Sequence, residues 1–451
     1  MNPAAILRAM HPSPAPLPPA GPPVSLRQAV RTWARVGALG FGGPAGQIAV
    51  LHRIVVEEKQ WVDEPRFLHA LNFCMLLPGP EAQQLATYVG WMMHGVRGGL
   101  AAGILFILPG FFILSVLSAL YAAYQETAFV AALFFGLKAA IIAVVVEALI
   151  RIGKRALRGR GFVTIAAAAF ISLSLLDISF PIVVLGAGLA GWMMSRGSDP
   201  APDVTNRSAL SNPVSWKRTA RVVAVCFVLW WAPVALLAML FGARSVWVTE
   251  GLFFGHAATV TFGGAYALLA YVAQQAVENY GWLAPGEMLD GLGLAETTPG
   301  PLILVVQFVA FLGAWRDPGP LPPLVAGLLG ATLTAWVTFA PSFLFIFAGA
   351  PYVERLRGNR GLSAALAGIT AAVVGVILNL AVWFSLHVLF ARVSEVDAGP
   401  FHFLVPDWQT LDVASLLIAL GAAFALFRLK WGMLPTLAAA VAAGLAIRLI
   451  G

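Results

Sequence analysis

Charged residues are scarce in this chain. Only 11% of its 451 residues are Asp, Glu, Lys or Arg, against about 25% in an ordinary soluble domain. Hydrophobic residues make up 59%, and the mean hydropathy is +0.83. This balance excludes a water-soluble enzyme, a disordered scaffold and a coiled coil. The apolar runs are long and do not alternate with a period of two, which disfavours a membrane β-barrel. A polytopic helical membrane protein remains.

Cysteine is nearly absent, with Cys74 and Cys226 far apart inside apolar runs. These two residues cannot supply a disulfide framework, a CxxC redox pair or a metal cluster. A nucleotide-binding fingerprint is also missing, so we expect no metal, no cofactor and no enzymatic activity. The run from Pro12 to Pro23 has no apolar core, so a cleaved signal peptide is not indicated. The net charge of +7 is attributed to basic cytoplasmic loops, and no nucleic-acid partner is expected.

A repeated set of motifs divides the chain into two halves. Phe41-Gly42-Gly43 recurs as Phe262-Gly263-Gly264, Trp61 as Trp282, and Pro78-Gly79-Pro80 as Pro299-Gly300-Pro301. Each pair is separated by 221 positions (262 − 41, 282 − 61 and 299 − 78). Further on, Pro109 matches Pro341 and Gly136 matches Gly368 at a separation of 232 (341 − 109 and 368 − 136). One insertion in the proline-rich stretch from Trp315 to Pro323 explains the difference.

The repeats predict the organisation of the chain. We expect a cytoplasmic N-terminal tail (1–24), a first transporter repeat (25–196), a cytoplasmic linker with one unpaired helix (197–244) and a second repeat (245–451). The run from Val222 to Phe241 is long enough to span once and has no counterpart in the first half. One unpaired crossing inverts the second half relative to the first. The predicted fold class is an all-α polytopic membrane protein, with two homologous halves in inverted topology, broken or re-entrant helices and about 10–13 membrane segments.

The charges of matching loops support the inversion, because Lys and Arg favour the cytoplasmic side. The loop 151–160 carries five basic residues, whereas its counterpart at 392–407 carries Arg392 with three acidic residues. The turn at Gln125-Glu126 has no basic residue, whereas residues 351–360 hold three arginines. In the last hairpin, the loop of the first half carries Asp177, whereas the corresponding loop of the second half carries Arg428 and Lys430. Three loop pairs therefore exchange sides, and the N-terminus is expected in the cytoplasm.

Each half also contains short, interrupted helices. A helix over about 65–77 ends at Pro78-Gly79-Pro80, and another begins at Glu81. The first proline stops a helix, glycine permits an unusual turn, and the second proline suits the start of the next helix. The free N–H groups of a helix start inside the protein favour an anion. Such pairs in two halves indicate a transporter binding site, although a structural kink is the alternative reading.

Several polar residues lie at or near these turns. The candidate substrate-binding residues are Gly42, Gly43, Pro78, Gly79, Pro80, Gln83, Gln84, Lys138, Gly263, Gly264, Thr297, Thr298, Pro299, Gly300 and Pro301. Lys138 lies inside an apolar span, where a cation is costly and often functional; the alternatives are pairing with a carboxylate such as Glu81, or snorkelling. Glu81 and Glu296 are candidates for gating or proton coupling. Trp61 and Trp282 are interpreted as interfacial anchors.

These motifs resemble a known family. Phe-Gly-Gly-Pro at 41–44, Leu-Pro-Gly-Pro-Glu-Ala-Gln-Gln-Leu-Ala at 77–86, His-Gly-Val-Arg-Gly-Gly at 94–99 and Ala-Glu-Thr-Thr-Pro-Gly-Pro at 295–301 resemble the chromate ion transporter family. The resemblance extends from about Ser25 to the end, in the long-chain, two-domain form. One departure is Ala265 where the first half has Pro44, which makes the halves unequal.

The resemblance implies transport of chromate, with sulfate as a further substrate left open, across the bacterial inner membrane, as an exporter that confers chromate resistance. Lipid is then a partner, and a homodimer is left open. Two alternatives remain: a carrier of sulfate or another small oxyanion, and a proton-coupled exchanger of the same architecture. A membrane-embedded enzyme is disfavoured.

Overall fold

The computed structural model describes residues 24–195, 216–260, 265–350 and 360–449. The Phe262-Gly263-Gly264 motif and most of the 351–360 loop therefore lie outside the described residues, as do the tail 1–23 and the linker residues 196–215.

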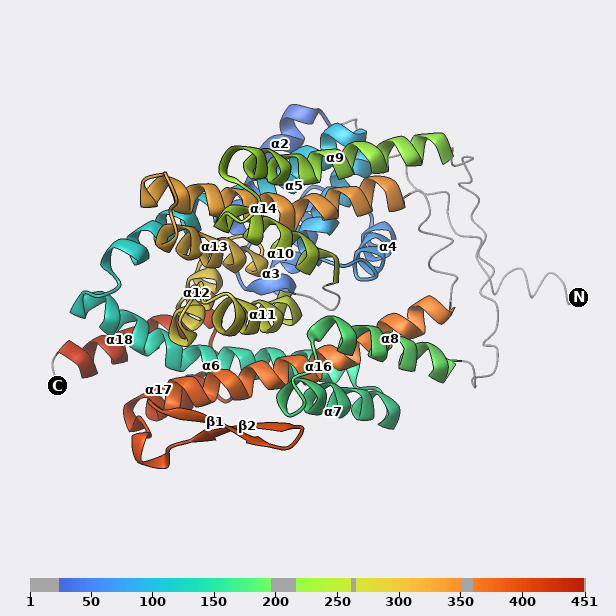
Figure 1. The fold of residues 1–451 in the computed structure, drawn as a ribbon. Helices are drawn as coiled ribbons and strands as arrows, with labels where there is room; N and C mark the ends of the chain where they lie inside the picture. Colours follow the sequence, from blue (N-terminus) through green and yellow to red (C-terminus); the bar gives the residue numbers. More distant parts are fainter. Residues whose placement is uncertain (1–23, 196–215, 261–264, 351–359, 450–451) are drawn as a thin grey trace, which may run out of the picture.

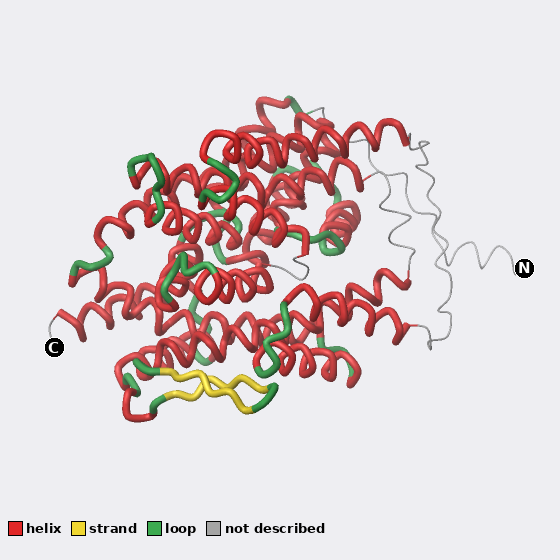
Figure 2. The backbone as a smooth tube through the Cα atoms, viewed as in Figure 1, coloured by secondary structure: helices red, strands yellow, loops and turns green. Residues whose placement is uncertain are grey.

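The described chain is built almost entirely from helices (Figures 1 and 2). The first-half elements are α2 (Leu26–Leu39), α3 (Gly43–His52), η1 (Arg53–Glu58), α4 (Glu64–Cys74), α5 (Glu81–Tyr124), α6 (Ala128–Ala156), α7 (Arg160–Ser174) and α8 (Phe180–Ser195). The connecting helix is α9 (Trp216–Phe241). The second-half elements are α10 (Val246–Val260), α11 (Ala265–Gln274), η2 (Gln275–Asn279), α12 (Pro285–Thr297), η3 (Leu302–Leu304), α13 (Val305–Arg316), α14 (Pro323–Gly349), α16 (Arg360–Leu389), β1 (Val393–Ala398), β2 (Phe401–Pro406), η5 (Trp408–Thr410), α17 (Val413–Phe427) and α18 (Met433–Leu449).

Five described helices are long and apolar enough to cross a membrane: α5, α6, α9, α14 and α16. Shorter apolar helices accompany them, namely α7, α8, η3 with α13, α17 and α18. The prediction of a polytopic helical membrane protein is confirmed. The polar segment near 393–411 departs from the helical rule, since β1 and β2 form an antiparallel hairpin there.

The repeated sequence folds into repeated local structure. The π-helices η1 and η2 are each followed by a residue with positive φ, Gln60 (52°) and Gly281 (62°). The next residue in each half is a tryptophan, whose N–H donates 2.8 Å to a carbonyl six positions earlier. Because an unusual backbone is reproduced at the same register in both halves, homology of the halves is visible in conformation as well as in sequence.

The α5 segment is a helical hairpin. The backbone leaves the helical region at His94 and Gly95, where Gly95 has φ 61°. The arms pack closely, because a Cβ on Gly90 would lie 2.4 Å from the carbonyl oxygen of Gly98. In the second half α13 and α14 are the two arms, and a loop over 317–322 joins them. This loop is the insertion that the change in repeat spacing predicts.

The halves exchange their terminal hairpins. α6 packs against α17 and α18, whereas α16 packs against α7 and α8. Gly136 on α6 meets Ala440 on α18, and its repeat partner Gly368 on α16 meets Ala187 on α8. In Figure 1, α6 begins on the side where α16 ends, so these matching helices are antiparallel. This arrangement agrees with two homologous halves in inverted topology, and it buries small residues where backbones touch.

The inversion leads to a labelling prediction. On a background without Cys74 and Cys226, we expect Arg158→Cys to react with an impermeant thiol reagent from the cytoplasmic side and Ala398→Cys from the periplasmic side. Both positions are exposed and avoid the neighbouring glycines Gly159 and Gly399, whose positive φ would strain a cysteine. The measurement is mass-tag labelling of intact cells and of inverted vesicles. Reaction of both cysteines from one side would contradict the topology.

Candidate functional site

The first-half Pro-Gly-Pro turn is buried and separates α4 from α5. Gly79 has φ 110°, a conformation that L side chains rarely adopt, and Pro80 is the N-cap of α5. Gln84, one turn into α5, donates from Nε2 to the carbonyl oxygen of Pro78 at 2.6 Å. This bond satisfies a carbonyl that the interrupted helix leaves open. The N-terminus of α5 therefore begins inside the protein, as the sequence predicts.

The second-half turn repeats this backbone and contacts the other half. Gly300 has φ 102°, and the chain resumes helical structure at η3 and α13. The Gly300 N–H donates to the carbonyl oxygen of Gly40 at 2.9 Å, and Gln47 Nε2 donates to the Gly300 carbonyl oxygen at 2.5 Å. Gly42 (φ 86°) and Gly43 (φ 65°) lie between these two partners. The broken Phe-Gly-Gly helix of the first half is thus bonded to the turn of the second.

Each turn also rests on the proline-bearing part of the other half's long helix. Gly110, next to Pro109 on α5, lies so close to the second turn that an added Cβ would be 2.2 Å from the Pro299 carbonyl oxygen. Ser342, next to Pro341 on α14, holds the matching position, where a Cβ on Gly79 would be 3.2 Å from its Oγ. The two turns therefore lie where the halves meet.

The amides and hydroxyls beside the turns have varied partners. Gln83 donates to Thr87 Oγ1 at 3.0 Å, and its own buried Oε1 has no hydrogen-bond partner. Thr297 and Thr298 donate to carbonyl oxygens of α12. In this conformation the two threonine hydroxyl protons are occupied, so they would have to rotate to donate to an oxyanion.

The two candidate glutamates differ in their surroundings. Glu296 is buried at the end of α12, and its Oε1 accepts a 2.6 Å hydrogen bond from the Tyr266 hydroxyl on α11. Glu81 is half-buried at the start of α5, and no hydrogen bond or ion pair holds it among the described residues. The positive charge of Arg155 on α6 acts on it electrostatically.

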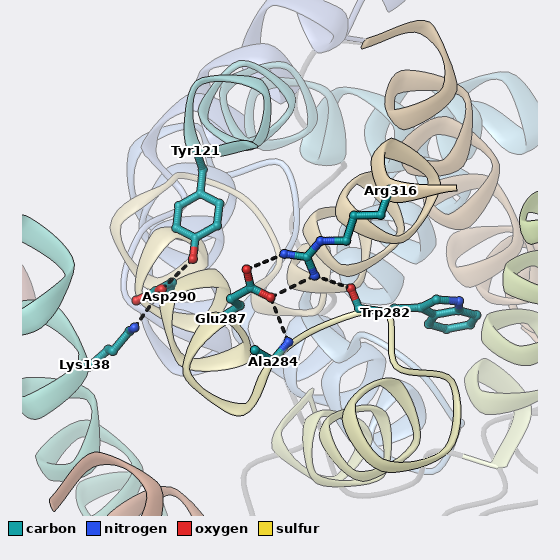
Figure 3. Close-up of polar contacts among 7 residues, drawn as sticks. All are labelled: Tyr121, Lys138, Trp282, Ala284, Glu287, Asp290 and Arg316. Atoms are coloured by element: carbon teal, nitrogen blue, oxygen red, sulfur yellow. Dashed lines mark hydrogen bonds and ion pairs between the residues drawn. The ribbon is translucent and has the colours of Figure 1, made fainter. Parts of the chain in front are cut away.

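Lys138 has a different partner from the one considered from sequence. Its Nζ lies 3.1 Å from Oδ2 of Asp290 on α12, and the Tyr121 hydroxyl donates to the same oxygen at 2.7 Å (Figure 3). Pairing of Lys138 with Glu81 is therefore wrong for this conformation. Asp290 also lies nine residues before Pro299, so Lys138 is away from the turns rather than beside them. Its side chain is 30% exposed, whereas that of Asp290 is 2% exposed.

An open cavity of about 750 Å³ gives access to this ion pair. Glu287 and Arg316 lie in its wall, where the guanidinium bonds both carboxylate oxygens and also donates to the Trp282 carbonyl oxygen at 2.7 Å (Figure 3). Glu287 Oε2 accepts from the Ala284 N–H at 2.7 Å, so this carboxylate closes the first turn of α12. Arg448 also lines the cavity. Three cations (Lys138, Arg316 and Arg448) and three carboxylates (Glu126, Glu287 and Asp290) line the cavity. Two ion pairs form among them, Lys138 with Asp290 and Arg316 with Glu287.

Comparison with known proteins identifies the family of this fold. The family profile described as chromate transporter matches residues 27–192 and 249–446. The chain belongs to the chromate transporter family. The Chromate transport protein of Pseudomonas aeruginosa is 34% identical over 413 residues, which cover 89% of this chain and 92% of that protein. The Chromate transport protein of Cupriavidus metallidurans is 28% identical and covers 83% of this chain and 85% of that protein. No solved structure matches the chain.

A shorter relative matches only part of the chain. An uncharacterized transporter of Bacillus subtilis is 31% identical over 163 residues, which are 35% of this chain and 82% of that protein. Most of this shorter relative thus aligns with about one third of the chain, in line with the two-half architecture. Membership and the apolar helices together make this chain a multi-pass membrane transporter.

Sequence reasoning missed several residues of the candidate site. Asp290 and Glu287 interrupt the apolar helix before the second turn, and a carboxylate at such a place was a usable signal for an ion pair with Lys138. Trp282 was expected at the membrane interface, but it is 7% exposed and stacks on Tyr280 with ring centroids 4.3 Å apart. The ring of Trp282 therefore packs inside the protein and does not face lipid as an interfacial anchor would. Gly263 and Gly264 lie outside the described residues, so their place in the site stays a prediction.

Proposed function

We propose that this protein is a transmembrane carrier of chromate, which exports the dianion from the cytoplasm and thereby confers chromate resistance. The observation that carries the proposal is the pair of buried Pro-Gly-Pro turns, each starting a helix inside the protein where the halves meet. Oriented N–H groups and the positive end of a helix dipole favour an anion. The names of the relatives from Pseudomonas aeruginosa and Cupriavidus metallidurans supply the substrate.

The proposed binding site uses the turns and their neighbours from both halves. Backbone N–H groups at the starts of α5 and η3 would donate to the oxyanion, and the amides of Gln83 and Gln84 lie one turn further on. Glu81 is the residue with an unfavourable charge, since a carboxylate repels a dianion. We propose that Glu81 is protonated or turned away while the anion is bound.

Lys138 has a separate place in the proposed route. Since it lies in the open cavity beside Asp290, it would meet the anion between the turns and the outer solution. A dianion that reaches Lys138 would displace Asp290 as its ion-pair partner. Asp290 would then have the gating role that sequence alone suggested for Glu81. The fixed positive charge would offset the cost of bringing a dianion into a region of low dielectric constant.

The energetics favour export. One charge that crosses 100 mV gains about 2.3 kcal/mol, so a dianion leaving a cytoplasm held at roughly −150 mV gains on the order of 7 kcal/mol. Export therefore needs a selective alternating path but no coupling ion. We place the protein in the bacterial inner membrane with a cytoplasmic N-terminus, and we leave open whether it works as a homodimer.

Transport into inverted membrane vesicles tests this proposal. We expect chromate uptake that disappears when valinomycin with potassium collapses the membrane potential. Nigericin, which collapses the pH gradient alone, should leave most of the uptake. Loss of uptake with nigericin alone would instead support a proton-coupled exchanger.

Sulfate is the substrate that the site distinguishes least, because the proposed donors recognise a tetrahedral dianion by charge and shape. Counterflow with each anion in turn separates the two. Exchange of sulfate without any exchange of chromate would identify a sulfate carrier of the same architecture.

A further inference from the structure

A second carboxylate is buried away from the proposed anion site. Glu250, in the first turns of α10, is 0% exposed, and neither of its side-chain oxygens has a hydrogen-bond partner among the described residues. The oxygens lie against glycines of two other helices. A Cβ on Gly313 of α13 would be 2.7 Å from Oε1, and one on Gly330 of α14 would be 2.8 Å from Oε2. Nothing larger than glycine would leave room for this carboxylate.

No cation neutralises Glu250 within the part of the chain that the structure describes. The charged or titratable side chains on the surrounding elements are His256 on α10, Lys217, Arg218, Arg221 and Cys226 on α9, Tyr266 and Tyr271 on α11, Arg316 on α13, and Arg244 and Asp317 in the adjoining loops. Arg316 forms an ion pair with Glu287. Asp317 is negatively charged, so it repels a negative charge on Glu250 and does not compensate it. A buried carboxylate without a counter-charge is far more stable with a proton bound.

A stripe of hydroxyls runs from Glu250 along one face of α14. Thr334, Thr338 and Ser342 follow Gly330 at intervals of four residues, and each is at most 1% exposed. The hydroxyls of Thr334 and Thr338 have no hydrogen-bond partner among the described residues. At the far end, Ser342 Oγ lies 3.4 Å from Gln84 Nε2, beside the first Pro-Gly-Pro turn. Successive side chains are about 5–6 Å apart, a gap that one water molecule bridges.

The other half shows that the fold does not require this stripe. Glu250 corresponds to Ala29 (250 − 221), and the three hydroxyl positions correspond to Ala102, Phe106 and Gly110 (334 − 232, 338 − 232 and 342 − 232). All four counterparts are apolar or lack a side chain, yet the helices around them match. The second half therefore carries four buried polar groups that the matching helices of the first half lack.

We propose that Glu250 is an intramembrane proton-binding site, and that the hydroxyls of Thr334, Thr338 and Ser342 relay the proton between it and the first Pro-Gly-Pro turn. In each step a hydroxyl or water accepts one proton and releases another, so only the carboxylate changes its charge. The relay ends one turn from Glu81, the residue that a bound dianion would require to be neutral. The inference concerns a proton and does not depend on which anion is carried.

Infrared spectroscopy of the purified full-length protein tests the site without any substrate. We expect a C=O stretch of a protonated carboxyl at neutral pH that is missing from Glu250→Gln, and that shifts when H₂O is replaced by D₂O. A sealed, purely structural glutamic acid would not exchange its proton. The double variant Thr334→Val, Thr338→Val should slow this exchange by about tenfold or more. Thr332→Val is the matched control on α14, because Thr332 is exposed, and it should leave the exchange unchanged.

The outcomes separate the readings. Absence of the protonated band, or a band that does not respond to D₂O, would overturn the proton site. Exchange at the wild-type rate in the double valine variant would overturn the relay. A protein that exchanges the Glu250 proton but does not carry chromate would support the proton site and contradict the proposed function alone.

Discussion

Replacing Lys138 with methionine is expected to abolish chromate transport and to destabilise the protein. The substitution removes the positive charge of Lys138 from the open cavity and leaves Asp290 buried without its ion-pair partner. Breaking a fully buried ion pair costs about 3–5 kcal/mol, and the loss here should be smaller because Lys138 is 30% exposed to the cavity. Chromate uptake in inverted vesicles and thermal unfolding in detergent measure the two effects separately.

A second variant separates stability from function at this pair. In Lys138→Met, Asp290→Asn neither charge remains, so we expect most of the lost stability to return while transport stays absent. Lys154→Met is the matched control, because it makes the same change on an exposed part of α6. If Lys138→Met carries chromate at the wild-type rate, the lysine is structural, and the proposed exchange of its partner Asp290 for the anion is wrong.

Gly110→Ala should be damaging although it adds only one methyl group. The new Cβ would lie 2.2 Å from the Pro299 carbonyl oxygen, so either α5 or the second turn must shift. Overpacking of this kind costs about 1–3 kcal/mol, and displacement of the turn should lower chromate transport by about tenfold or more. The measurements are uptake in inverted vesicles and the unfolding midpoint.

Gly421→Ala on α17 is the control for Gly110→Ala, since it makes the same change in a helix where nothing lies within 4 Å of the new atom. It should leave both uptake and unfolding unchanged. Normal uptake by Gly110→Ala would mean that the second turn tolerates displacement, and the anion site would then have to lie elsewhere.

The features predicted well from sequence are those that backbone chemistry dictates. Proline and glycine at fixed spacing predicted the interruption between α4 and α5, because proline fixes φ and lacks an N–H donor, and glycine readily takes the positive φ that the turn requires. The spacing change predicted the loop over 317–322. The repeat also predicted that helices match in pairs, and the matched contacts of Gly136 and Gly368 follow from it.

The features missed depend on which side chains the tertiary fold brings together. Lys138 has carboxylates on both sides in sequence, and only the packing of α6 against α12 selects Asp290 over Glu81. Trp282 looked like an interfacial anchor because composition does not show that Phe254 and Tyr280 stack on its ring. Glu250 was overlooked because a single carboxylate has no periodicity, and its meaning depends on two glycines from other helices.

The exchanged hairpins restrict how this molecule can move. At Gly136 and Gly368 the backbones of α6 and α16 touch the hairpins of the opposite half, so these helices cannot slide without breaking contacts on both sides at once. Such an interlocked frame behaves as one rigid body. The switch between inward and outward access in a transport cycle would then come from the segments outside this frame, namely the short helices on either side of each Pro-Gly-Pro turn. The short helices of each half would move within a fixed scaffold, and only one half would need to open to solution at a time.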